Sequence, residues 1–92
     1  MIAKEDLEWQ LWKDAFSVRS ELTPPPKYSE SNAFWVTARE KINAAHEKYQ
    51  GTYLNLLSEH IFFGILMQLE QESKAKEKIE NLVMETANKL RS

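Results

Sequence analysis

Residues 53–69 read YLNLLSEHIFFGILMQL, and this apolar stretch decides the fold. Successive residues of a helix are turned by 100°, which places apolar side chains of this stretch on both sides of its helix. One neighbouring helix cannot cover both sides, so the pattern predicts a central helix in a helical bundle. One side carries Leu54, Leu57, Ile61, Phe62, Ile65 and Leu69, and the other carries Tyr53, Leu56, Phe63 and Met67.

This stretch is too short to cross a membrane. A spanning helix needs about 20 largely apolar residues, whereas Glu59 and His60 interrupt this run. The chain also does not begin with the basic and then apolar pattern of a secretory signal, because Lys4, Glu5 and Asp6 come first. We therefore expect a cytoplasmic protein with no membrane partner.

The composition predicts one small domain that gains stability by association. In a chain of 92 residues, roughly 60–65% of the unfolded surface can be buried, which leaves stability marginal. The absence of cysteine excludes disulfides and thiolate metal sites, so oligomerisation is the remaining means. The 12 basic and 14 acidic side chains are mixed along the sequence, which does not favour nucleic acid as a partner. We predict a homodimer of a single helical domain, residues 1–92.

Prolines and glycines divide the chain into helices. Apolar residues at helical spacing predict a first helix over about residues 3–21, followed by a stiff, proline-rich linker over residues 23–30. Thr23 precedes a proline, which excludes helical geometry there and ends the helix. The predicted buried stripe of this helix is Leu7, Leu11, Ala15, Val18 and Leu22.

A second helix is predicted over about residues 31–50. Ser31 suits the N-cap position, and Gly51 suits the left-handed residue that ends a helix. Thr52 can cap the next helix, and so short a joint makes the second and third helices an antiparallel hairpin. The predicted buried stripe is Phe34, Ala38, Ile42, Ala45 and Tyr49, with Trp35 beside it.

The third helix, about residues 53–90, either runs unbroken or breaks near Ser73. The sequence therefore predicts an all-α fold of three to four helices in an antiparallel bundle. An unbroken third helix would be about 55 Å long, and the first two helices would cover half of it. A second copy, or the first helix folded along the C-terminal half, would cover the remainder. We favour a second copy, which would pack on the stripe formed by Ile79, Leu82, Val83 and Leu90.

No arrangement of residues in the sequence specifies catalysis, a metal site or a cofactor. Neither His46 nor His60 follows a glutamate at the Glu-x-x-His spacing of helical metal sites. Ser58, Glu59 and His60 are consecutive, so on a helix they diverge instead of meeting as a triad. We expect His60 to be a partly buried structural residue and His46 to lie at the surface, in a protein that is not an enzyme.

An aromatic set on the first helix is a candidate partner-binding site. Trp9, Trp12 and Phe16 lie about 60–120° beyond the edge of the aliphatic stripe of that helix. They are covered by Trp35 of the same chain, by a second subunit or by another protein. Tryptophan is enriched at the hot spots of protein interfaces.

The linker contains a candidate linear motif. Pro25, Pro26 and Tyr28 match the Pro-Pro-x-Tyr pattern that WW domains bind in a polyproline conformation. The structural alternative is a stiff linker with Tyr28 packed over the start of the second helix.

The main functional hypothesis is a self-associating protein–protein interaction module, acting as an adaptor, an inhibitor or an assembly subunit. One alternative is a DNA-binding regulator in which Gly51 forms the turn of a helix-turn-helix. The third helix has no Arg or Lys before Lys74, which argues against that alternative. A further alternative is a WW-domain ligand that acts through Pro25, Pro26 and Tyr28.

Overall fold

The computed structural model describes residues 6–91, and these residues form an all-α fold. The described part of the chain contains no strand, so the predicted fold class is confirmed. The predicted start of the first helix near residue 3 lies outside the described residues. The elements are α1 (Leu7–Glu21), the 3₁₀ helix η1 (Tyr28–Glu30), α2 (Asn32–Glu47) and α3 (Asn55–Arg91).

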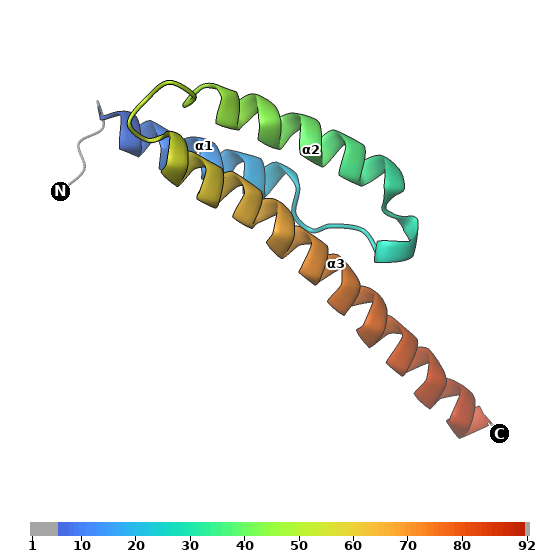
Figure 1. Cartoon of the computed structure of the whole chain (residues 1–92). Coiled ribbons are helices and arrows are strands. Elements are labelled where there is room, and N and C mark those ends of the chain that lie inside the picture. The colour runs from blue at the N-terminus through green and yellow to red at the C-terminus, as the bar shows by residue number, and fades with distance from the viewer. Residues whose placement is uncertain (1–5, 92) are drawn as a thin grey trace.

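The three α-helices form a bundle at one end of the molecule and leave a single helix at the other. In Figure 1, α1 and α3 run in the same direction and α2 runs antiparallel to both. The second half of α3 extends past the ends of α1 and α2, which makes the molecule elongated, with extents of 61 × 28 × 18 Å. The predicted long C-terminal helix is therefore present and unbroken.

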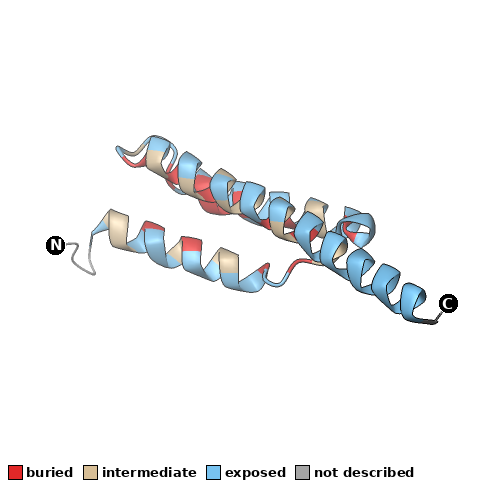
Figure 2. Cartoon of the chain, turned by 90° about the horizontal axis from the view of Figure 1, so that it is seen from below, coloured by how far each residue is buried: buried red, intermediate tan, exposed pale blue. Residues whose placement is uncertain are grey.

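The core lies where the buried stripes of the three helices meet, and Figure 2 shows the buried residues gathered between the helices of the bundle. Each predicted stripe supplies residues to this core. Because each face repeats at i, i+3, i+4 and i+7, a full face of each helix is removed from water. The core residues are Leu11, Ala15, Leu22, Ala38, Ile42, Ala45, Tyr49, Leu54, Phe62 and Leu69.

Ser31 is the N-cap residue of α2, as predicted, but its side chain does not cap the helix. The Ser31 side chain makes no capping hydrogen bond to α2. Its Oγ instead donates to the carbonyl oxygen of Tyr28 at 2.5 Å and accepts from Trp35 Nε1 at 2.6 Å. Ser31 is buried, and its two hydrogen bonds join η1 to the first turn of α2.

The connection between α2 and α3 is longer than predicted. α2 ends at Glu47, and residues 48–54 form a series of turns. Gly51 has the expected left-handed φ of 79°, although it lies beyond the C-terminal cap residue, Lys48. The Thr52 hydroxyl donates to the carbonyl oxygen of Tyr49 at 2.6 Å and accepts from the backbone amide of Leu54 at 3.2 Å. Thr52 therefore stabilises the turn that leads into α3.

The predicted alternative of a break near Ser73 is wrong, because α3 is continuous through this residue. Ser73 is fully buried, and its Oγ donates to the carbonyl oxygen of Pro26 at 2.6 Å. Lys76 Nζ donates to the carbonyl oxygen of Pro25 at 3.3 Å. The proline linker therefore covers the polar middle of α3. The alternative in which α1 covers the C-terminal half is also wrong, since α1 lies beside the first half of α3.

The expectations for the two histidines are reversed. His46 is buried, whereas His60 is exposed. The ring of His46 lies edge-on to the ring of Phe63, with centroids 5.6 Å apart. His46 is four residues after Ile42 and so lies on the same face of α2, which is the face that packs into the core.

Candidate functional site

The end of α3 presents an uncovered apolar surface. Every residue from 78 to 90 is exposed, and Figures 1 and 2 show this part of α3, which we call the C-terminal arm (residues 78–91), projecting beyond the bundle. At 100° per residue, all the apolar side chains of residues 78–90 except Met84 fall, together with Thr86, within about 140° of arc. We call this set the arm stripe: Ile79, Leu82, Val83, Thr86, Ala87 and Leu90.

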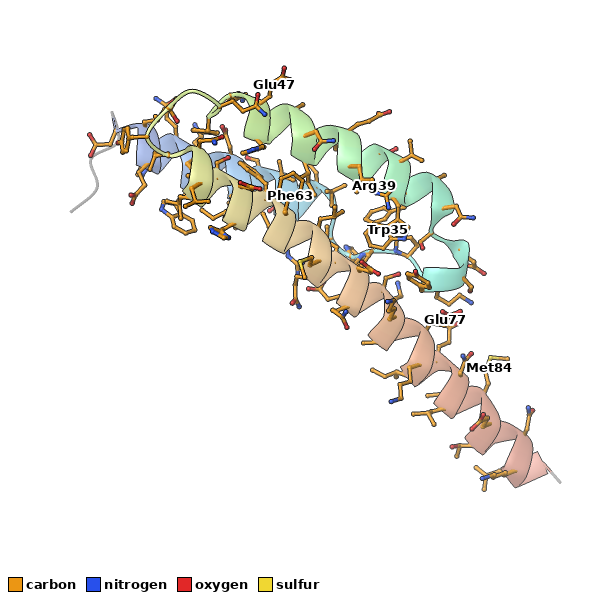
Figure 3. The ribbon with its side chains drawn as sticks, in the orientation of Figure 1. Trp35, Arg39, Glu47, Phe63, Glu77 and Met84 are labelled. Atoms are coloured by element: carbon orange, nitrogen blue, oxygen red, sulfur yellow. The ribbon has the colours of Figure 1, made fainter. Side chains whose placement is uncertain are left out.

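The arm stripe is substantially open to water. Ile79, Leu82 and Val83 have exposed fractions of 62%, 53% and 63%, and Leu90 reaches 83%. Figure 3 shows Glu77 and Met84 on the same side of the helix, and helical geometry places that side about 140–160° from Ile79. The side opposite the arm stripe carries Asn81, Glu85 and Asn88 besides Met84. The arm is therefore amphipathic, and its apolar side has no cover from the described part of the chain.

The aromatic set of α1 lies on another exposed part of the molecule. Trp9 is partly buried, and Lys13 Nζ lies 5.5 Å from the centroid of its ring. Trp12 is 48% exposed and donates from Nε1 to Glu8 Oε2 at 3.4 Å, while Phe16 is 75% exposed. The indole and phenyl faces of Trp12 and Phe16 are thus available for a contact that the single chain does not make.

Trp35 lies elsewhere and does not cover this aromatic set. Its ring lies edge-on to Phe34 with centroids 4.9 Å apart, and it lines a hollow with Leu66 and Glu70 of α3. Figure 3 shows Trp35 near the start of α2, on the side that faces α3. The sequence alternative in which Trp35 covers Trp9, Trp12 and Phe16 is therefore not realised.

The candidate linear motif is held against α3. Pro25 is buried and Pro26 is partly buried, and their carbonyl oxygens accept hydrogen bonds from α3. Tyr28 is 41% exposed, with Lys74 Nζ 5.0 Å from the centroid of its ring. Lys27 Nζ lies 3.4 Å from Glu80 Oε1 of α3. Binding of this segment to a WW domain would require these contacts to break.

A buried serine–histidine pair joins α2 to α3, and sequence reasoning missed it. His46 Nδ1 lies 2.7 Å from Ser58 Oγ, and both side chains are buried, Ser58 completely. A nucleophile must be reached by its substrate, whereas this pair is closed inside the bundle. Its contribution is a satisfied buried hydrogen bond. The signal in the sequence was the spacing from Ile42 to His46, which places the imidazole on the buried face.

Two polar contacts hold α1 in place in the bundle. Midway along α1, Tyr49 Oη donates to Asp14 Oδ2 at 2.7 Å, and burial, followed by this hydrogen bond, raises the pKa of Tyr49. Near its end, Arg19 Nη2 donates to Glu72 Oε2 at 2.6 Å. The hydrogen bond from Arg19 lowers the pKa of Glu72, aided by Gln68 and opposed by burial.

Within residues 6–91 no helix combines the length and apolar character needed to cross a membrane. The same residues hold no group of three or more His, Cys, Asp and Glu side chains placed to bind a metal ion. Comparison of the chain with protein-family models, with curated proteins and with solved structures found no match. The exposed surfaces themselves are therefore the basis for a functional argument.

Proposed function

We propose that this chain is a self-associating protein–protein interaction module whose binding element is the C-terminal arm. The supporting observation is the uncovered arm stripe, which places four large aliphatic side chains on one side of a projecting helix. An amphipathic helix gains its stability in water mainly by packing its apolar face. Contiguous exposed apolar surface of this kind marks interaction sites.

A second feature supports an interaction role. Trp12 and Phe16 expose large aromatic surfaces, and such side chains dominate the energetics of interfaces. Under this proposal they belong to the binding surface, as an adaptor or assembly subunit requires.

The two alternative functions have less support. A DNA-reading helix-turn-helix would insert its second helix into the major groove, but Phe62 and Leu69 of α3 are buried in the core of the bundle. For a WW-domain ligand, Pro25 would have to leave its buried position against α3.

The test is the solution mass measured by light scattering after size exclusion, over a hundredfold range of concentration. The wild-type chain, of 10.8 kDa, is expected to have twice this mass at the upper end of the range. Leu82→Arg places a charge on the arm stripe and is expected to weaken the dimer at least tenfold. Asn81→Arg is the matched control, because Asn81 is exposed on the other side of the arm and is expected to leave the mass unchanged.

Two outcomes would count against the proposal. A wild-type chain that is monomeric at every concentration would contradict self-association. If Leu82→Arg and the wild type are both dimers of equal mass, the arm stripe is not part of the interface. Circular dichroism of both variants checks that the bundle itself remains folded.

A further inference from the structure

We infer that two copies pair antiparallel along the whole exposed side of α3, so that the arm of each copy lies beside Trp12 of the other. This inference rests on the proposed self-association and specifies its geometry. It joins the arm stripe and the aromatic set, which are separate features of one chain, into a single interface.

The first observation is a stripe on α3 that is longer than the arm. A run of exposed, uncharged residues at spacings of three or four extends along α3 from Gly64 to Leu90, over about 39 Å. Solvated helix faces normally carry charged residues, whereas this face has them only at its two edges, where Glu72 is paired with Arg19 and Lys89 lies near the end of the arm. We call it the uncharged stripe: Gly64, Gln68, Gln71, Ala75, Ile79, Leu82, Thr86 and Leu90.

The second observation places the α1 aromatics beside this stripe. α1 and α3 run in the same direction (Figure 1), and Arg19 is hydrogen-bonded to Glu72. Seven residues make close to two helical turns. Trp12 is seven residues before Arg19 and Ile65 is seven residues before Glu72, so Trp12 and Ile65 lie at the same level along the two helices. Trp12 therefore flanks the start of the uncharged stripe, and Phe16 lies one turn further along α1 on the same side.

The third observation is that the large aliphatic residues of the uncharged stripe lie in its C-terminal half, whereas its first half holds Gly64, Ala75 and two glutamines. With the two-fold axis between residues 71 and 72, Ile79 of the second copy faces Gly64, where an added side chain would meet no atom within 4 Å. Ala75 then faces Gln68, and Leu82 faces Ile61. An isologous pairing makes each of these contacts twice.

The interface area also favours this arrangement over contact between arms alone. A stable dimer buries roughly 600–1,000 Å² per partner. An arm stripe about 18 Å long and about 10 Å wide covers about 200 Å². The full uncharged stripe covers about 400 Å², and the exposed parts of Trp12 and Phe16 add about 250 Å². Only the longer interface reaches the required range.

The orientation of the two copies is tested by the distance between spin labels. The chain has no cysteine, so Met67→Cys and Asn88→Cys each provide a single labelling site per chain. Both residues are exposed, and they lie about 90° and 150° from the middle of the uncharged stripe. Double electron–electron resonance on each labelled dimer then reports one distance between symmetry-related labels.

The proposed geometry predicts a label separation below about 30 Å at position 67 and about 50 Å at position 88, from the rise of a helix and the spacing of packed helices. Antiparallel contact between the arms alone would reverse these values and overturn the inference, while leaving the proposed function intact. Parallel pairing would give short distances at both positions and would likewise overturn only the geometry. If no dipolar coupling is observed and light scattering finds a monomer, the proposed function is contradicted as well.

A variant separates the same geometries without labels. Gly64→Arg adds a side chain to a site that is open in the single chain, and it is expected to weaken dimerisation at least tenfold. Asn81→Arg is the matched control and is expected to have no effect. Unchanged dimerisation of Gly64→Arg would show that the interface does not extend to the first half of α3, which contradicts the inference.

Discussion

The hydrogen bond between His46 and Ser58 is the buried polar link between α2 and α3. Removing one partner leaves the other buried without a hydrogen bond, and this loss costs about 1–3 kcal/mol. We therefore expect Ser58→Ala to lower the free energy of unfolding by about 1–3 kcal/mol, measured by urea denaturation. The exposed Ser20→Ala in α1 is the control, with a change within about 0.5 kcal/mol. Equal effects of the two substitutions would show that the His46–Ser58 bond does not stabilise the bundle.

The ion pair between Arg19 and Glu72 makes a pH-dependent contribution to stability. Arg19 lowers the pKa of Glu72 from its ordinary value of 4.5, so the folded state favours the carboxylate. The contribution is therefore present at neutral pH and is lost as the pH falls through the lowered pKa. Because both side chains are partly exposed, solvent screening limits it to under about 1 kcal/mol.

The matching experiment compares the wild type with Glu72→Gln. The difference in unfolding free energy is expected at pH 7, should shrink as the pH falls below 4.5, and should vanish once the pH lies below the lowered pKa of Glu72. The exposed Glu85→Gln in the arm is the control and is expected to show no difference at either pH. A Glu72→Gln difference that persists in acid would assign the effect to packing instead of charge.

The helices and their buried faces were predictable from the sequence, and the polar contacts between elements were only partly so. The apolar stripes of α1, α2 and α3 predict the core because hydrophobic burial follows helical periodicity. Ser73 continues the buried face of α3, four residues after Leu69, but its role depends on where the proline linker crosses. Polar spacing alone does not specify such a tertiary contact. The arm stripe was predictable because its apolar residues keep helical phase.

The stability of the arm depends on what covers it. An isolated helix of about 14 residues is marginal in water, and in the single chain residues 78–90 are all exposed. Hydrogen exchange is expected to show protected arm amides in the wild-type dimer. In Leu82→Arg, these amides should exchange at least tenfold faster, while protection within residues 55–69 of α3 is retained. Arm protection that is the same in both proteins would contradict a dimer built on the arm.

In the whole molecule, folding and association are expected to be coupled. One small bundle buries limited apolar surface, and pairing along α3 adds to it, so the melting temperature should depend on chain concentration. A tenfold increase in concentration contributes about 1.4 kcal/mol per dimer, or about 0.7 kcal/mol per chain. For a domain of this size the melting temperature is then expected to rise by about 3–6 °C.

Differential scanning calorimetry at several concentrations measures this dependence. Leu82→Arg and Gly64→Arg should melt at a temperature that does not change with concentration, because both substitutions weaken the dimer. Asn81→Arg should follow the wild type. A concentration-independent melting temperature in the wild type would show that the bundle is stable alone. Residues 6–77 would then fold stably without the dimer. Association through the arm would contribute to binding and not to the stability of the fold.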